Sequence, residues 1–476
     1  MPDSRPDLPL YVDLDGTLIK SDVTCEALLL LIKSNVLYLA LIPFWLLRGL
    51  LGLKQQIARR ISISIDKIPY NGEFLDYLQQ EKAAGRKLIL ISASHQQYVD
   101  KFAEHSSLFD SVIGSDVEIN LKSQNKLQRI IELSEGREFA YAGNASADVP
   151  IWSAAQQAIL VNCSPALRDS VNDSHADTLL FDQPQSPVEK LWQAMRPHQW
   201  LKNTLLFVPL VLSHQLLNPG LLLQAAIAFI SFSLCASSVY LLNDLLDLQN
   251  DRLHPSKYRR PFASGELDLR IGMLAMPLLL CVAFAIALFL PAQFLVVLAI
   301  YFLLTTAYSL LLKRWFLIDV AVLALLYGVR VIAGAAAIAV PPTNWLIGFA
   351  LSLFLGLAMI KRIAELSNLD GESETSPAGR AYHVGHRRLL IATGASSSLL
   401  AVLIFAFYIN DPATTRLYES PQTLWLICPL LLVLLVRIWR RARAGIIDED
   451  PVLFAATDRI SQIVVLVCGL LVWLAI

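Results

Sequence analysis

The chain has 476 residues, of which 55% are hydrophobic and 17% charged, and its formal net charge is −1. This composition agrees with a membrane protein that carries a soluble part, whereas the near-neutral charge by itself indicates no class of partner. The six cysteines are scattered and form no CxxC pair, which excludes an evident disulfide framework or zinc site. The polar opening segment does not have the pattern of a secretory signal peptide, and we expect no nucleic-acid partner.

The first 188 residues have the strands, polar turns and dispersed charge of a soluble α/β domain. The run LPLYVDLDGTL at 8–18 is a short apolar strand that ends in two aspartates one residue apart. Asp13, at the strand end, can attack phosphorus, and Asp15 can shuttle the proton of the leaving group. Thr17 and the nearby backbone amides would help to cradle the phosphate. This arrangement suits phosphoryl transfer.

An apolar insertion, EALLLLIKSNVLYLALIPFWLLRGLLGLK, follows at 26–54. Because Lys33, Ser34, Asn35 and Pro43 interrupt it, we expect a helical hairpin that lies in the cytoplasmic leaflet rather than a membrane span. Such a hairpin would form a cap that could admit a lipid-borne phosphate. A cap that packs simply against a transmembrane domain is an equal alternative.

The strand-end motif is similar to the first motif of the haloacid dehalogenase (HAD) superfamily, and the later motifs follow in order. KLILISAS at 87–94 predicts a second strand whose end offers Ser92 as a phosphate ligand. Lys126 matches the charge-neutralising lysine of that superfamily, with Lys122 as a competitor. In FAYAGNASAD at 139–148, the resemblance implies that Asp148 holds Mg²⁺ together with Asp13.

One position departs from the HAD pattern. The fourth motif commonly carries an aspartate where this chain has Asn144, which keeps an oxygen for the metal but loses one negative charge. We therefore expect weaker Mg²⁺ binding, and the domain could be a slow phosphatase or a binding relic. Since the other motif residues remain, we favour an active domain.

From about residue 189 to 476, apolar runs of membrane-spanning length alternate with short charged loops. The pattern predicts an α-helical polytopic membrane domain with about nine spans. They are expected near 201–217, 221–242, 271–289, 292–312, 317–339, 343–360, 389–408, 422–439 and 460–476.

Basic residues are concentrated in alternate connections, such as the 252–270 cluster and Lys313–Arg314, whereas the opposite connections contain only Arg416. By the positive-inside rule, this asymmetry predicts that the N-terminal domain and the loops with motifs face the cytoplasm. The expected location is the bacterial inner membrane.

The most informative stretch is NDLLDLQNDRLHPSKYRRPFASG at 243–265, where Asp244, Asp247 and Asp251 are spaced i, i+3, i+7. A helix would place all three carboxylates on one face. Carboxylates at the mouth of a membrane span are costly unless they are paired or bind a metal. With Asn243 they would hold Mg²⁺ against a diphosphate, whose oxygens Lys257 and Arg260 could meet. The alternative to a metal and diphosphate site is an ordinary charged juxtamembrane loop without a binding function. His254 could also bind phosphate, or it could serve only to shape the turn.

This stretch resembles the first aspartate-rich motif of the UbiA superfamily of intramembrane prenyltransferases, and the resemblance covers about residues 190–476. The flanking segments look most like the polyprenyl-phosphate phosphoribosyltransferases of the decaprenyl-phosphate type. These segments are MRPHQWLKN at 195–203, YSLLLKRWFLIDV at 308–320, KRIAEL at 361–366 and DPVLFAATDR at 450–459.

Later loops offer further candidates for substrate binding: Tyr308, Lys313 and Lys361. For each lysine the positive-inside bias alone is a serious competing explanation. Prenyltransferases that use prenyl diphosphates typically show a second aspartate-rich motif here, but this loop has one acid, Asp319, among basic residues.

A single metal cluster with additional cations favours a phosphorylated sugar donor and an anionic lipid acceptor. The resemblance thus implies that phosphoribose moves from 5-phosphoribosyl diphosphate to polyprenyl phosphate. Because the phosphatase-like site is expected on the same cytoplasmic side, we expect the HAD domain to remove the 5-phosphate of the product. One alternative is prenyl transfer from a polyprenyl diphosphate to an aromatic or other small acceptor. Another is a membrane half that only anchors a HAD phosphatase.

Overall fold

The computed structural model describes residues 7–116, 119–175, 177–182, 186–367, 382–447 and 450–476. It divides into two compact units, each of which is described by itself. The first unit consists of Met1–Met195 and Tyr240–Met276, and the second of Arg196–Val239 and Pro277–Ile476.

The first unit is built on a six-stranded parallel sheet in the order β3-β2-β1-β4-β5-β6. Short, almost fully buried strands such as β1 are typical of a parallel sheet covered by helices on both faces. In register, Leu10 of β1 lies beside Leu88 of β2 and Ala140 of β4. The strands are β1 (Leu10–Val12), β2 (Leu88–His95), β3 (Ser111–Ser115), β4 (Ala140–Gly143), β5 (Gln157–Val161) and β6 (Thr178–Phe181). The strands predicted within 8–18 and at 87–94 are confirmed, and the motif at 139–148 begins in a further strand, β4.

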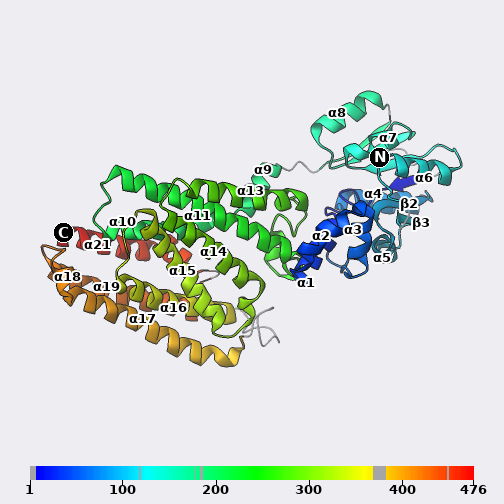
Figure 1. Cartoon of the computed structure of the whole chain (residues 1–476). Helices are drawn as coiled ribbons and strands as arrows, with labels where there is room; N and C mark the ends of the chain where they lie inside the picture. Colours follow the sequence, from blue (N-terminus) through cyan, green and yellow to red (C-terminus); the bar gives the residue numbers. More distant parts are fainter. Residues whose placement is uncertain (1–6, 117–118, 176, 183–185, 368–381, 448–449) are drawn as a thin grey trace. The chain divides into compact units, whose positions relative to one another are not determined.

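Helices surround this sheet (Figure 1). They are α4 (Gly72–Ala83), α5 (Gln96–Ser106), α6 (Gln124–Ser134), η1 (Ser146–Asp148), α7 (Val149–Trp152) and α8 (Pro165–Ser174). The helix α9 (Pro187–Ala194) lies apart from the sheet, and its Lys190 forms an ion pair with Glu266. A buried ion pair strengthens the domain, because the Arg86 guanidinium lies 2.8 Å from the Glu81 carboxylate and also donates to the Leu8 carbonyl.

The insertion after β1 folds into three helices, α1 (Val23–Ser34), α2 (Tyr38–Leu46) and α3 (Gly49–Ala58). Asp22 caps α1 by accepting a hydrogen bond from the Cys25 amide. Around α2, large apolar side chains are exposed: Leu37 by 74%, Phe44 by 65% and Leu47 by 84%. The insertion is therefore helical with an apolar surface, but it forms three helices rather than the expected two-helix hairpin.

The rest of the first unit is a segment that starts in the last turns of α11 (Pro219–Leu246). It continues through α12 (Leu248–Leu253) and η3 (Lys257–Arg259) into the first turns of α13 (Leu269–Ala287). Gly265 has φ +74°, and a Cβ there would lie 2.4 Å from the Lys20 Cβ. This residue must be glycine for the segment to lie so close to the loop after β1.

The second unit is helical, and α16 lies along both α15 and α17 (Figure 1). Besides parts of α11 and α13 it contains η2 (Pro197–Phe207), α10 (Val208–Leu212), α14 (Ala292–Leu310), η4 (Leu312–Arg314), α15 (Ile318–Ala337), α16 (Asn344–Ser367), η5 (Val384–His386), α17 (Arg387–Asn410), α18 (Pro412–Thr415), η6 (Pro421–Leu426), α19 (Ile427–Arg443), α20 (Pro451–Thr457) and α21 (Arg459–Ala475).

By length and composition, seven helices of the described part could cross a membrane, or eight if α20 and α21, bent by 80°, count as one span. The predicted fold class, a polytopic helical membrane domain with a soluble α/β domain, is confirmed. The predicted span at 201–217 is wrong, because this stretch is a 3₁₀-helix followed by a five-residue α-helix. Its Lys202 and Asn203 are buried in polar contacts that a lipid-facing span could not provide.

Candidate active sites

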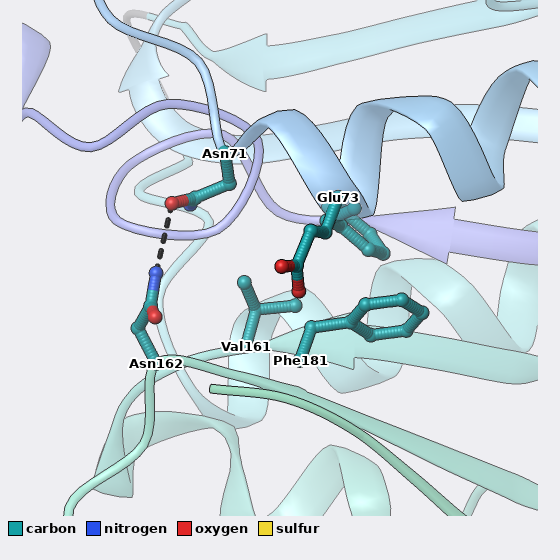
Figure 2. Close-up of a pocket in the computed structure, with 6 residues that line it drawn as sticks. Asn71, Glu73, Val161, Asn162 and Phe181 are labelled. Carbon is teal, nitrogen blue, oxygen red and sulfur yellow. Dashed lines mark hydrogen bonds between the residues drawn. The ribbon is translucent and has the colours of Figure 1, made fainter. Parts of the chain in front are cut away.

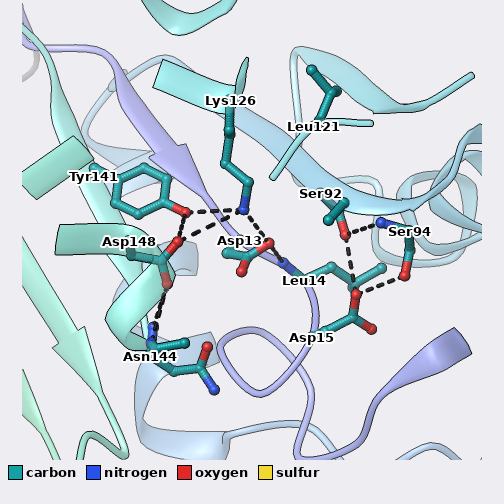
Figure 3. A network of polar contacts seen from close by, with 12 residues as sticks. Asp13, Leu14, Asp15, Ser92, Ser94, Leu121, Lys126, Tyr141, Asn144 and Asp148 are labelled. Atoms are coloured by element: carbon teal, nitrogen blue, oxygen red, sulfur yellow. Dashed lines mark hydrogen bonds and ion pairs between the residues drawn. The ribbon is translucent and has the colours of Figure 1, made fainter. Parts of the chain in front are cut away.

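Three predicted residues of the phosphatase-like site lie together (Figure 3): Asp13 after β1, Asp148 after β4 and Lys126 in α6. Lys126, from α6, lies 2.9 Å from Asp13 Oδ1 and 3.9 Å from Asp148 Oδ1. Burial raises the pKa of Asp13 to about 6 despite the lowering effect of Lys126. Burial alone would lower the pKa of Lys126, but Asp13 and Asp148 raise it overall. A charged lysine therefore stands between the two carboxylates, and Lys126, not Lys122, occupies this place.

Asp15 turns away from this cluster toward the end of β2 (Figure 3). Its Oδ2 accepts hydrogen bonds from Ser94 (2.6 Å) and Ser92 (3.2 Å), and its Oδ1 accepts the Val23 amide of α1 (2.8 Å). Burial, followed by the charges of Asp22 and Asp13, raises the pKa of Asp15 to about 7. A carboxyl that titrates near neutrality suits a general acid and base. In this conformation the Ser92 hydroxyl serves Asp15, so its role as a phosphate ligand stays a prediction.

The loop after β1 is held in place by Asn71, which is itself hydrogen-bonded to Asn162. Asn71 donates to the Thr17 carbonyl (2.5 Å) and accepts from Asn162 (2.8 Å), in a small hollow beside Val161 and Phe181 (Figure 2). The Thr17 hydroxyl is buried and has no hydrogen-bond partner among the described residues. An unsatisfied buried hydroxyl next to Asp13 and Asp15 is consistent with a donor reserved for a substrate oxygen.

The residues near Asp148 could hold Mg²⁺ with a small set of donor groups. Its Oδ2 accepts the backbone amides of Asn144 and Ala145, and the Asn144 side chain lies against Gly16. In the described part of the chain no three His, Cys, Asp or Glu side chains converge as metal ligands. The donor set is two carboxylates and one amide, and since Mg²⁺ often binds through one or two carboxylates and substrate phosphate, these residues suit it.

Sequence reasoning missed three residues of this site. Ser94 makes the shortest hydrogen bond to Asp15, and the buried Tyr141 hydroxyl donates to Asp148 (2.7 Å). Lys54, the last residue of the apolar insertion, donates to the Ala93 carbonyl (2.6 Å), and burial lowers its pKa. Ser94 and Lys54 stand in the segments that sequence analysis had singled out, but neither position carries a signal of its own.

The aspartate loop, residues 243–265, forms the second candidate site. The structure interrupts the expected single helix at Asp247, where φ −95° and ψ 11° depart from helical values. Asp244 and Asp251 still meet, because both accept hydrogen bonds from Arg260 Nη1, at 3.0 and 2.6 Å. Asp244 is 2% exposed and Asp251 is 4% exposed. Burial raises the pKa of Asp251, opposed by Arg260 and Lys257, so Lys257 also lies near this carboxylate.

Asp247 has a different partner. Its Oδ1 lies 2.9 Å from Lys33 Nζ, at the C-terminal end of α1. Asn243 stands one turn earlier, and its carbonyl accepts the Asp247 amide (2.8 Å). The loop therefore presents two convergent buried carboxylates and a third held by a lysine, with Arg260 and Lys257 beside them. Two carboxylates that share one cation are suited to share Mg²⁺ with a diphosphate.

In the second unit, two predicted residues belong to a buried network. Tyr308 donates to Asp319 (2.8 Å), while Arg362 lies 2.6 Å from Asp319 and donates to Tyr308 (3.0 Å). Asp319 is fully buried, so the one acid of this loop is neutralised by an arginine. Lys313 lies in η4, between Tyr308 and Asp319 in the sequence, and is half-buried.

Lys361 belongs to a polar cluster that sequence analysis did not assemble. Its amino group lies 3.4 Å from Asp450, the N-cap of α20. Asp450 also contacts Lys202 (2.6 Å) and accepts from the Tyr327 hydroxyl (2.7 Å). Nearby, Arg330 is buried and donates to Asn203 (2.9 Å). The segments 195–203 and 450–459 had been noted for their likeness to phosphoribosyltransferases, which was the available signal.

The fold and these sites define an integral membrane protein that joins a helical transferase domain to a phosphatase-like domain. The model of the UbiA prenyltransferase family matches residues 204–457, and that of the haloacid dehalogenase-like hydrolases matches residues 10–151. The chain belongs to the UbiA prenyltransferase family, and the predicted fusion with a HAD-like domain is confirmed.

Three relatives show which proteins the chain resembles in sequence. An uncharacterised protein, y4nM, of Sinorhizobium fredii is 35% identical and aligns over 95% of this chain and 88% of its own length. The nodulation protein NoeC of Azorhizobium caulinodans is 31% identical over 58% of this chain and 89% of its own. The decaprenyl-phosphate phosphoribosyltransferase of Mycolicibacterium smegmatis is 27% identical over 60% of this chain and 91% of its own. The chain is thus a UbiA-type transferase related, at low identity, to phosphoribosyltransferases.

Proposed function

We propose that the chain transfers phosphoribose from 5-phosphoribosyl diphosphate to a polyprenyl phosphate. The observation that carries the proposal is the difference between the two loops. The aspartate loop offers Asp244 and Asp251 beside cations, whereas Asp319 in the later loop is buried against Arg362. One acidic cluster suits one diphosphate, and the remaining cations suit a second anionic substrate. The likeness to decaprenyl-phosphate phosphoribosyltransferases supports the same donor.

In this reaction an oxygen of the lipid phosphate attacks C1 of the ribose, and the bond from C1 to the diphosphate breaks. Bound Mg²⁺ would supply charge stabilisation for the departing diphosphate. Asp244, Asp247 and Asp251, with Asn243, would hold the metal, and Arg260 and Lys257 would bind diphosphate oxygens. No protein nucleophile is needed, because the lipid phosphate is already an anion. Tyr308, Lys313 and Lys361 are assigned to substrate binding.

The HAD domain would then hydrolyse the 5-phosphate of the lipid-linked product. Asp13 attacks phosphorus while Asp15 protonates the departing ribose oxygen, and water subsequently releases phosphate from Asp13. Lys126 offsets the charge on the transferring group, and Thr17 and Ser92 donate to its oxygens. Asp148, Asp13 and Asn144 would hold Mg²⁺.

The domain boundary is proposed near residue 188, with the transferase domain from 189 to 476. The exposed apolar side chains of the insertion at 26–54 support its lying in the membrane surface, where a lipid-borne phosphate is concentrated. The distribution of basic residues supports a cytoplasmic position of the N-terminal domain and of the aspartate loop in the bacterial inner membrane.

The test is incubation of the purified full-length protein with Mg²⁺, ribose-labelled 5-phosphoribosyl diphosphate and polyprenyl phosphate, followed by extraction of the lipid. Label should enter the lipid fraction only when polyprenyl phosphate is present. In a parallel reaction, a prenyl diphosphate and 4-hydroxybenzoate should give no product. A prenylated aromatic without ribosyl lipid would instead establish prenyl transfer.

A further inference from the structure

Helix α1 connects the two candidate sites of the first unit. At its N-terminal end the Val23 amide donates to Asp15 of the phosphatase-like site (2.8 Å). At its C-terminal end Lys33 lies 2.9 Å from Asp247 of the aspartate loop. Since a helix rises about 1.5 Å per residue, some 15 Å separate these two contacts. One rigid element thus touches a residue of each site.

The position of α1 is fixed along its length by contacts to the same segment. Glu26 forms a bidentate ion pair with Arg252 of α12 (2.7 and 3.0 Å), and Asp22 pairs with Arg270. Between Glu26 and Lys33, Leu29 and Leu30 of α1 line a small hollow together with Leu245 and Leu248. These contacts hold Lys33 beside the loop independently of its own ion pair.

The ion pair of Lys33 with Asp247 is accessible enough for another cation to replace Lys33. The two side chains are 25% and 27% exposed, so water and ions reach them, unlike the buried pair of Glu26 and Arg252. Arg260 in turn forms ion pairs with both Asp244 and Asp251. The cations that contact the three carboxylates of the loop therefore include one, Lys33, that comes from the N-terminal domain.

We propose that Lys33 is a positioning residue of the transferase site, an internal cation that holds Asp247 and competes with the divalent metal for it. The proposal rests on the proposed metal-binding role of the aspartate loop. Metal and diphosphate would displace the Lys33 ammonium from Asp247, and the displaced charge would lie beside an incoming anionic substrate. The N-terminal domain is in this view a part of the transferase site rather than only an attached hydrolase.

The test measures Mn²⁺ binding by electron paramagnetic resonance, with full-length protein in detergent and inorganic diphosphate present. An Asp148→Asn background weakens the metal site of the HAD domain. Lys33→Met removes the competing cation and should tighten Mn²⁺ binding by roughly two- to fivefold, the range expected for a partly exposed ion pair. Lys33→Arg should bind as the parent does. Lys82→Met is the matched control, because Lys82 forms a partly exposed ion pair with Asp110 in the same domain.

A second arm places Lys33→Met in an Asp247→Asn background, where the lysine has no carboxylate to hold and its removal should change nothing. Unchanged or weaker Mn²⁺ binding in Lys33→Met would overturn the proposal, as would an equal shift with Asp247→Asn present. The titration needs no sugar donor or lipid. Hence a tightened Mn²⁺ response in a protein that forms no ribosyl lipid would sustain the role of Lys33 and reject only the proposed donor.

Discussion

Glu26 of α1 and Arg252 of α12 form a bidentate ion pair whose side chains are 1% and 4% exposed. Arg252 also donates to the Ala263 carbonyl, and Ser21 donates to Glu26, so the charges are well satisfied by hydrogen bonds. The pair joins residues 226 positions apart in the sequence, one in the N-terminal domain and one in the aspartate loop. Breaking such a pair leaves a buried charge without its counter-ion, which typically costs about 3–5 kcal/mol.

The first prediction compares two buried glutamates. Glu26→Gln and Glu81→Gln should both lower the unfolding temperature, because each leaves a buried arginine uncompensated. Only Glu26→Gln should also reduce transferase turnover, by roughly tenfold, since residues that orient metal ligands typically contribute that much. Turnover is measured as ribosyl lipid formed per enzyme below the unfolding temperature. Equal loss of turnover in both variants would assign Glu26 to stability alone.

The second prediction concerns the carboxylates that meet at Arg260. Asp244→Ala and Asp251→Ala should each reduce turnover at least about a hundredfold, because both remove charge stabilisation of the leaving diphosphate. Asp247→Ala should also be strongly impaired. Asp268→Ala, an exposed carboxylate of the same segment, serves as the control and should retain turnover. Near-normal rates in two of the three loop variants would reject the metal assignment.

The third prediction concerns Asp450 and the acid resistance of its cluster. Burial alone would raise the pKa of Asp450, but Lys361 and Lys202 outweigh it and hold the pKa well below its usual range. A carboxyl with a depressed folded-state pKa contributes stability above its unfolded value, near 4, and loses it only at lower pH. Asp450→Asn should therefore lower the unfolding temperature by the same amount at pH 7 and pH 5.5. A difference that vanishes by pH 5.5 would contradict this assignment.

The sequence predicted those parts of the fold that local patterns encode. The acids at the end of β1, the motif around Asp148 and the apolar runs of α13 to α17 are all continuous signals. The prediction of a membrane span at 201–217 was wrong because it relied on the average hydropathy of the run. That average gives little weight to the two polar residues Lys202 and Asn203. These side chains are stabilised by Asp450 and Ser233, from distant segments.

The partner of Asp247 could not be predicted in this way. Lys33 looked like an interruption in an apolar insertion, and only the folded chain brings it to a carboxylate 214 residues away. Likewise, the i, i+3, i+7 spacing of the aspartates predicted that Asp244 and Asp251 converge, but it did not predict the helix break at Asp247. Long-range ion pairs leave no periodic trace in the sequence.

The last prediction addresses the weakest part of the phosphatase-like site, the amide of Asn144. Its side chain lies against Gly16 and its backbone amide donates to Asp148. An aspartate there would occupy nearly the same volume. Asn144→Asp should lower the Mg²⁺ concentration for half-maximal phosphatase activity by roughly tenfold, because affinity of such sites follows the number of charged ligands. Asn125→Asp adds the same charge at an exposed position and should leave that concentration unchanged.

The substrate for this measurement is the ribosyl lipid 5-phosphate that the proposed transfer reaction would yield. Asp13→Asn should let it accumulate without slowing its formation, because only the hydrolytic step requires a nucleophile at that position. In the wild-type chain, saturating Mg²⁺ should convert it to polyprenyl-phosphoryl ribose and phosphate. If wild type, Asn144→Asp and Asp13→Asn all yield the same phosphorylated lipid at saturating Mg²⁺, the domain does not act on this product, and its remaining contribution is the support that α1 gives to the aspartate loop.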